Sequence, residues 1–176
     1  MMRGSLKDSI IKIYIMKRIF TIGLLTALLF QGKLIAQDVN ECMQDLSIFA
    51  EYVKVKNYKS AYEPWMRVRK NCPTLNIAIF TYGERILNDR IENGTPEEQQ
   101  SAKQDMIVLF EEWVVNFPKN KNVSAVGDII SSKAQAMLDY EMADLKTIYN
   151  TFDEAYTKDA ASFTNPKLLY NYFKTL

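Results

Sequence analysis

The chain has 176 residues, of which 48% are hydrophobic and 12% aromatic, a composition that excludes disorder and allows one domain with a sizeable core. Residues 1–36 hold six basic residues and one acid, so the other 16 basic and 20 acidic residues leave a charge of about −4 on residues 37–176, although the whole chain carries +1. A mildly acidic body is unlike a nucleic-acid-binding surface, and we expect no nucleic-acid partner.

The first 36 residues have the order of a secretory signal peptide. A basic region at 16–18 precedes an apolar run at 19–30, and Ala36 suits the position before a cleavage site. Residues 1–15 form an N-terminal extension, so Met16 is the predicted true start. Twelve residues span only about 18 Å as a helix, which is shorter than the hydrocarbon core of about 30 Å. An uncleaved membrane anchor is therefore the less favoured alternative. We predict an exported mature chain, residues 37–176, with no membrane span, located in the periplasm, at the outer membrane or outside the cell.

From residue 37 onward, apolar residues recur at spacings of three and four, which predicts helices. The first stripe runs from Val39 to Val53. The second helix begins either at Tyr58, which would place Pro64 inside it, or after Ser60, where Ser60 and Glu63 would form a capping box. The sequence leaves both starts open.

The third and fourth helices are separated by strong stop and start signals. The third is predicted near Leu75–Ile91, with Gly94 suited to a left-handed terminus. Thr95 is the predicted N-cap of the fourth helix, with Pro96 in its first turn, and this long helix reaches Phe117.

Three further helices follow a basic loop at Lys119–Asn122. Their apolar stripes lie within Val126–Met137, Leu145–Tyr156 and Leu168–Leu176. The last stripe reaches the final residue without a C-cap, a pattern compatible with a truncated product. Six or seven helices with short loops and no alternating strand pattern predict an all-α domain.

The stretch Asn57–Gly83 resembles a known repeat family. Its helix-packing positions are Tyr58, Ala61, Trp65, Val68, Pro73 and Gly83. This pattern resembles the junction of a tetratricopeptide repeat (TPR): a second helix, its closing proline and the first helix of the next repeat, with the glycine where two helices approach closely. The unit Val39–Pro73 matches the family's period of about 34 residues.

A second unit repeats part of this pattern. Phe110 and Trp113 precede Pro118 at the offsets that Trp65 and Val68 hold before Pro73. The resemblance implies antiparallel helix pairs stacked as a short TPR-like solenoid, and the signal segment makes the chain similar to exported repeat proteins of Bacteroidetes-type bacteria. A non-repeating helical bundle is the alternative.

Residue types needed for catalysis are missing from the sequence. There is no histidine, so neither of the two cysteines can form a Cys–His nucleophile, and the six glycines form no phosphate-binding loop. Two cysteines do not make a zinc site, and the spacing of Asp105, Asp128 and Asp144 does not suit calcium. We therefore predict no enzymatic activity, no catalytic residue, no metal site and no cofactor.

Some tyrosines are candidates for a binding surface. In a TPR-like stack the inner helices line a concave groove, and the groove candidates are Tyr52, Tyr62 and Tyr82, although a core position is favoured for Tyr82. A small basic face on the second helix, formed by Arg67, Arg69 and Lys70, is predicted to be solvated.

The two cysteines are predicted to form a disulfide. Cys42 lies 15 residues before Asn57, where the first hairpin turns, and Cys72 lies 15 residues after it. An antiparallel hairpin brings such positions side by side, and export to an oxidising compartment would let the thiols pair. Two buried free thiols are the alternative.

Two functions are compatible with these features. The first is a scaffold for protein–protein interaction in the cell envelope, with an unidentified protein or peptide partner. The second is a helical carrier of small ligands or glycans. The first is favoured because no pair of aromatic residues stands clear of the apolar stripes.

Overall fold

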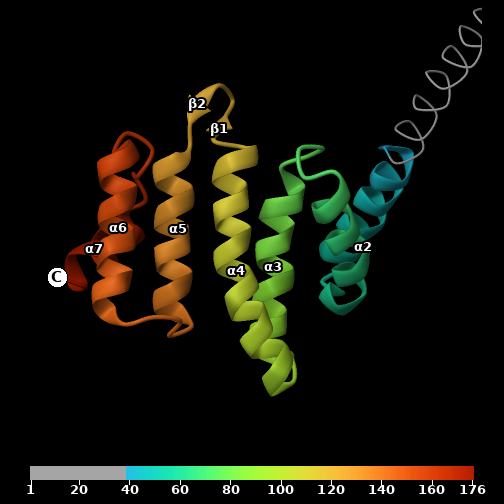
Figure 1. Ribbon diagram of the computed structural model, residues 1–176, viewed down its shortest axis with the longest axis horizontal. Coiled ribbons are helices and arrows are strands. Elements are labelled where there is room, and N and C mark those ends of the chain that lie inside the picture. Colours follow the sequence, from blue (N-terminus) through green and yellow to red (C-terminus); the bar gives the residue numbers. More distant parts are fainter. Residues whose placement is uncertain (1–38) are drawn as a thin grey trace, which may run out of the picture. The chain divides into compact units, whose positions relative to one another are not determined.

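The computed structural model describes residues 39–176 (Figure 1). The predicted extension and signal segment, residues 1–36, lie outside the described residues. Residues Cys42–Leu176 form one compact unit, to which the following description applies. The described part contains seven helices and one two-stranded hairpin, which confirms the predicted all-α class.

The helices follow one another with short connections. The first is helical over residues 39–54. The others are α2 (Tyr58–Asn71), α3 (Ala78–Asn93), α4 (Pro96–Asn116), α5 (Val126–Asp139), α6 (Leu145–Asp159) and α7 (Pro166–Lys174), and the strands β1 (Lys119–Asn120) and β2 (Val123–Ser124) join α4 to α5.

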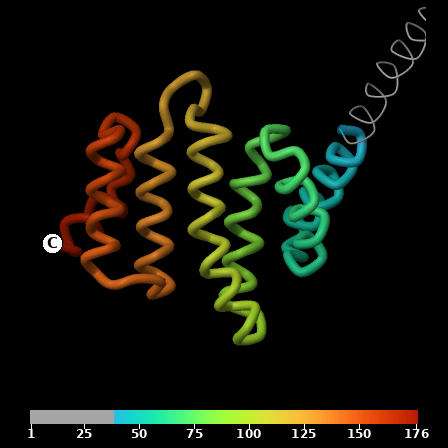
Figure 2. Tube along the Cα trace, in the orientation of Figure 1, coloured from blue at the N-terminus to red at the C-terminus, as the bar shows by residue number. Residues whose placement is uncertain are grey.

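Neighbouring helices pack in pairs. The most extensive helix contacts lie within α3/α4 and within α5/α6, and smaller contacts join α2 to α3 and α4 to α5. Figure 2 shows α3 to α6 running alternately up and down in sequence order. The α7 helix packs on both α5 and α6. The predicted stack of antiparallel helix pairs is therefore confirmed.

The structure shows which of the two predicted positions begins α2. The helix begins at Tyr58, because the side-chain oxygen of Asn57 accepts the Ser60 N–H at 3.3 Å and caps the first turn. Pro64 lies inside the helix, with its ring buried. The alternative start after Ser60, with a Ser60–Glu63 capping box, is wrong.

Two predictions for α3 are also wrong. The helix begins at Ala78 rather than near Leu75, because the Asn76 side chain accepts the Ala78 N–H at 2.8 Å and ends the preceding turn. Gly94 is not left-handed, since its φ is −78° and its ψ 172°. A Cβ there would lie 2.4 Å from the Arg90 carbonyl oxygen, so the position excludes a side chain because of this close approach.

The predicted capping of α4 is confirmed. The Thr95 side chain accepts the Glu98 N–H at 3.3 Å, and the Glu98 carboxylate accepts the Thr95 N–H at 2.9 Å. This reciprocal pair is a capping box, and Pro96 occupies the first turn.

The basic loop after α4 contains a short hairpin that the sequence analysis missed. Lys119 and Asn120 pair with Ser124 and Val123, and Lys121 and Asn122 between them have φ values of 48° and 68°. Two consecutive left-handed residues match the backbone of a tight hairpin turn, in which asparagine is well tolerated. Strands of two residues show no alternating pattern, which explains the miss.

The main core is organised around Trp65. Its side chain is fully buried, as are Ala61 and Val68, and its indole N–H donates to the Ile79 carbonyl oxygen at 2.7 Å. A Cβ on Gly83 would lie 2.7 Å from the indole ring, so α3 approaches α2 closely at this glycine, as predicted. Tyr58 and Pro73 are half-buried beside this core.

The two predicted repeat units end in the same way. Cys72, the C-cap of α2, has φ −139° and ψ 55°, and Phe117, the C-cap of α4, has φ −137° and ψ 63°. Each donates its N–H to the carbonyl four residues earlier, and each is followed by a proline, Pro73 or Pro118. Phe110 is buried like Trp65, whereas Trp113 is half-buried and stacks on Phe80 and Phe110.

The predicted disulfide between Cys42 and Cys72 is confirmed. The two residues are joined, with their Cα atoms 6.3 Å apart. The bond ties the start of the first helix to the C-cap of α2.

The predicted solvated basic face on α2 is wrong at Arg69. This side chain is only 6% exposed, lies over the Trp65 ring at 5.2 Å and donates to Glu112 at 2.6 Å and to Asp105 at 2.8 Å. Both acids belong to α4, so Arg69 joins α2 to α4. By contrast, Arg67 is exposed and pairs with Asp45 of the first helix.

Replacing Arg69 with methionine should lower the free energy of unfolding by about 1.5–3 kcal/mol, the usual value for hydrogen bonds to charged groups. Methionine keeps an apolar stem over Trp65 but leaves Asp105 and Glu112 without their cation. Arg67→Met, which removes an exposed ion pair, should cost less than about 1 kcal/mol. Denaturant unfolding of both variants measures the difference, and equal losses would contradict the structural role of Arg69.

Candidate functional site

A groove follows one face of α3, α5 and α7. It consists of two cavities of about 220 and 190 Å³ that share Asn88 of α3. The larger lies between α3, α5 and the start of α7, and the smaller lies between α3 and Tyr58 at the start of α2. We call these two cavities together the α3–α7 groove.

Carboxylates dominate the charge of the α3–α7 groove. Its ionisable carboxyl groups are those of Glu84, Asp89, Glu92 and Asp139, and its cations are Arg85 and Lys167. Within residues 39–176, none of these six side chains forms an ion pair. The groove therefore has a net negative charge and no internal charge pairing.

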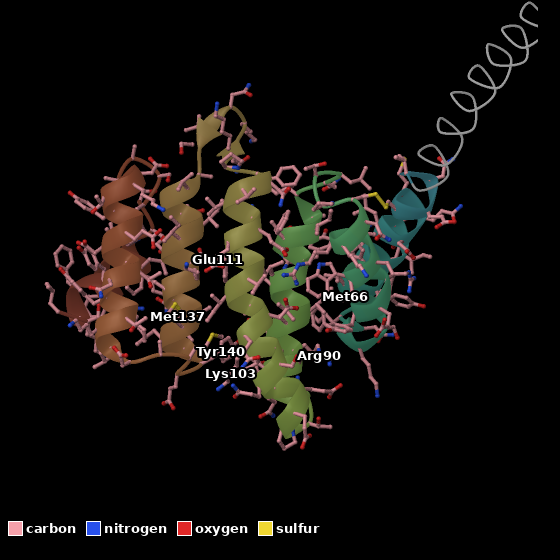
Figure 3. All side chains as sticks on the ribbon, viewed as in Figure 1. Met66, Arg90, Lys103, Glu111, Met137 and Tyr140 are labelled. Carbon is pink, nitrogen blue, oxygen red and sulfur yellow. A yellow bond between two sulfur atoms is a disulfide. The ribbon has the colours of Figure 1, made fainter. Side chains whose placement is uncertain are left out.

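Hydrogen bonds hold three of these carboxylates in place, and Asp89 accepts the Asn93 side-chain amide at 2.9 Å. Glu92 accepts the Tyr140 hydroxyl at 3.1 Å, and Asp139 accepts the Gln135 amide at 2.7 Å. The backbone at Tyr140 is in turn held by Lys103 of α4, whose Nζ donates to the Tyr140 carbonyl at 2.7 Å. Figure 3 labels Lys103 and Tyr140 close together at one end of these helices. The Tyr140 end of the groove is thus fixed by α3 and α4.

Glu84 is a half-buried carboxylate that lines the larger cavity of the groove. Burial raises its pKa above the ordinary value of 4.5, nearby Arg85 partly lowers it, and the Asp128 carboxylate on α5 adds to the increase. Burial also raises the pKa of Asp128. The surroundings of Glu84 therefore disfavour its charged form.

Glu84→Gln should raise the stability of the protein at pH 7. Because the folded-state pKa of Glu84 is raised, its contribution to stability is fully present below about pH 4.5 and is lost as pH rises through the folded-state pKa. A neutral glutamine avoids this loss, so the unfolding midpoint should rise at pH 7 and match the native protein near pH 4. Glu63→Gln, at an exposed position of α2, is the control and should change neither midpoint. A lower midpoint for Glu84→Gln at pH 7 would contradict the prediction.

Other charges on α2, α3 and α4 are paired within the described unit. Arg69 bonds to Asp105 and Glu112, and Arg90 lies 3.1 Å from Glu98. A third cavity, of about 290 Å³, lies among α4, α5 and α6 over Phe110, Val114 and Ile130. Its rim holds two Lys–Glu pairs, Lys133–Glu111 at 3.6 Å and Lys158–Glu154 at 2.7 Å. This cavity has an apolar floor and a neutral rim.

The three candidate tyrosines do not come together. Tyr82 packs edge-on against Phe49 at 6.4 Å and lies under Arg85, which lines the α3–α7 groove. Tyr62 lies instead between Trp65 and the Arg90 guanidinium, 3.9 Å above its ring.

Tyr52 is 37% exposed. It follows Asp45 by seven residues and so shares the helix face that pairs with Arg67 of α2. Of the three tyrosines, only Tyr82 adjoins the groove.

The polar residues of the groove were missed by the sequence analysis. Asn88, Ser132 and Asn165 lie on different elements, and no spacing along the chain links them. A periodic reading does place Glu84 and Asn88, four residues apart, on one face of α3, and this was the only available signal.

Residues 39–176 contain neither a metal-binding cluster nor a membrane-spanning helix. No group of three or more His, Cys, Asp or Glu side chains in this range is arranged to hold a metal ion. No helix in the same range is long and apolar enough to cross a membrane.

Comparison with known proteins finds no relative. No protein-family model matches the chain, and no curated protein or solved structure matches it. Any proposal for function must therefore start from the groove itself.

Proposed function

We propose that this protein is an exported, non-catalytic helical-repeat scaffold of the cell envelope that binds a protein or peptide partner in the α3–α7 groove. One observation carries the proposal: an open groove along α3, α5 and α7, lined by polar side chains that are not paired in charge with one another. Stacked helix pairs commonly present such surfaces to extended partners.

Two features support a repeat protein similar to the TPR family. The helix pairs are stacked, and α2 and α4 share C-cap backbone angles, a following proline and a buried aromatic residue eight positions before that proline. The sequence contains no histidine, which supports a non-catalytic role.

The second candidate function is a carrier of small ligands or glycans. The cavity of about 290 Å³ over Phe110 favours it, because ligand pockets are commonly apolar with a few polar groups at the rim. Binding of glycans on an array, lost when Val114→Trp fills this cavity, would promote the carrier over the scaffold.

Site-specific cross-linking tests the scaffold function. A photoreactive phenylalanine analogue at Asn88, shared by both cavities of the groove, should give a discrete adduct with one envelope protein in the producing cell. The same analogue at Val115, which is 78% exposed on α4 and lines none of the three cavities described above, should not give that adduct. Identical adducts at both positions, or none at Asn88, would contradict the proposal.

Export is tested separately. Protein from the producing cell should begin at or near Gln37, because the basic and apolar regions before Ala36 have the order of a cleaved signal. The disulfide between Cys42 and Cys72 supports an oxidising destination. N-terminal sequencing measures the start, and a membrane pellet containing chains that begin at Met16 would favour the anchor instead.

A further inference from the structure

We propose that the segment bound in the α3–α7 groove is cationic, an extended peptide stretch whose lysine or arginine side chains pair with the groove carboxylates. This inference rests on the proposed scaffold function and adds the chemistry of the partner to it.

The α3–α7 groove carries a net negative charge. Glu84, Asp89, Glu92 and Asp139 line it against only Arg85 and Lys167, and within the described part of the chain none of the four carboxylates has a cationic partner. Arg85 is itself placed over the Tyr82 ring, at 5.3 Å. A bound cation would therefore meet carboxylates that form no ion pair with a side chain of the described unit.

The groove carboxylates differ in their partners from several carboxylates elsewhere in the described unit. Some carboxylates between other helices receive a cation from the chain itself: Asp105 and Glu112 from Arg69, and Asp45 from Arg67. The groove carboxylates receive hydrogen bonds from the neutral donors Tyr140 and Gln135. The groove carboxylates therefore lack the cation that Asp105, Glu112 and Asp45 receive.

The partial burial of Glu84 also favours a cationic partner. This carboxylate is half-buried in the lining of the larger cavity, and its pKa is raised because burial disfavours its ionised form and the Asp128 carboxylate adds to the increase. A lysine or arginine at this position would replace lost hydration with an opposite charge, which a neutral or acidic residue cannot do.

The uncharged lining fits the rest of such a segment. Asn88 and Asn165 offer amide groups and Ser132 a hydroxyl to a peptide backbone. The half-buried Tyr58 ring offers apolar surface, on which the methylene stems of lysine and arginine pack readily. The groove can therefore hold both the heads and the stems of basic side chains.

The test uses the exported protein and three fluorescein-labelled nine-residue peptides with lysine, glutamine or glutamate at alternate positions, separated by glycine. Fluorescence anisotropy at 0.15 M salt should show the lysine peptide binding at least tenfold more tightly than the glutamine peptide, with no binding of the glutamate peptide. Raising the salt concentration should weaken the lysine peptide, since its contacts are between charges.

Two double variants with the same change in charge locate the binding. Glu84→Gln with Asp89→Asn, in the groove, should weaken the lysine peptide about tenfold. Glu63→Gln with Glu97→Gln, at exposed positions of α2 and α4 that line none of the three cavities, should change binding less than twofold. Equal weakening by both pairs would show non-specific attraction and overturn the inference.

The remaining outcomes separate the two proposals. Tighter binding of the glutamine or glutamate peptide, lost when Asn88→Trp fills the groove, would overturn the cationic partner and leave the scaffold function standing. No binding of any peptide, together with no cross-link from position 88, would overturn both.

Discussion

Replacing Trp65 with alanine should lower the free energy of unfolding by about 3–5 kcal/mol, as truncation of large core aromatics does. The indole is fully buried between α2 and α3, so its loss leaves a cavity that rigid helices cannot close. Its N–H also donates to the Ile79 carbonyl oxygen at 2.7 Å. Denaturant unfolding with fluorescence from the remaining Trp113 measures the change.

A second substitution, Gly83→Ala, tests the same contact between Trp65 and α3. Gly83→Ala alone should destabilise the protein, because its Cβ would lie 2.7 Å from the indole of Trp65. In the Trp65→Ala background the same Cβ enters vacated space, and alanine is favoured over glycine in a helix by about 1 kcal/mol. The effect of Gly83→Ala should therefore change sign between the two backgrounds.

Trp113→Ala is the matched control for the Trp65 variant. Trp113 is half-buried and stacks on Phe80 and Phe110, so its removal should cost clearly less than that of Trp65. Losses of equal size, or an unchanged unfolding midpoint in Trp65→Ala, would show that the core is not organised around Trp65.

The fold could be predicted because its determinants are local. Apolar spacing located all seven helices within residues 39–176, and Thr95, Pro96 and Asn165 marked helix starts through side-chain caps and fixed backbone angles. The predicted close approach at Gly83 and the pairing of Cys42 with Cys72 followed from one hairpin, whose geometry depends on few residues.

Other features depend on contacts between distant residues, and these were wrong or missed. The burial of Arg69 is decided by Asp105 and Glu112, 36 and 43 residues away. Gly94 suited a left-handed terminus in sequence, but its conformation is set by the approach of the Arg90 carbonyl. The α3–α7 groove is lined by residues of three helices, so no single stretch of sequence predicts it.

Reducing the disulfide between Cys42 and Cys72 should lower the free energy of unfolding by roughly 3–4 kcal/mol in the chain-entropy estimate. The bond closes a loop between residues 30 positions apart, so its loss lets the unfolded chain adopt many more conformations. The first helix should be affected most, because its start is tied to α2 through Cys42. Unfolding in guanidinium chloride with and without a reductant measures the loss.

The comparison with Cys42→Ala/Cys72→Ala separates the covalent bond from packing. Reduction keeps both sulfur atoms in place, whereas the double variant also removes the buried Cys42 side chain, which is only 4% exposed. The reduced protein should therefore lie between the oxidised protein and the double variant in stability. Unchanged unfolding on reduction would show that the loop is already constrained by the packing of Phe49 and Trp65. Two alkylatable thiols in protein isolated from the producing cell would show that the bond does not form there.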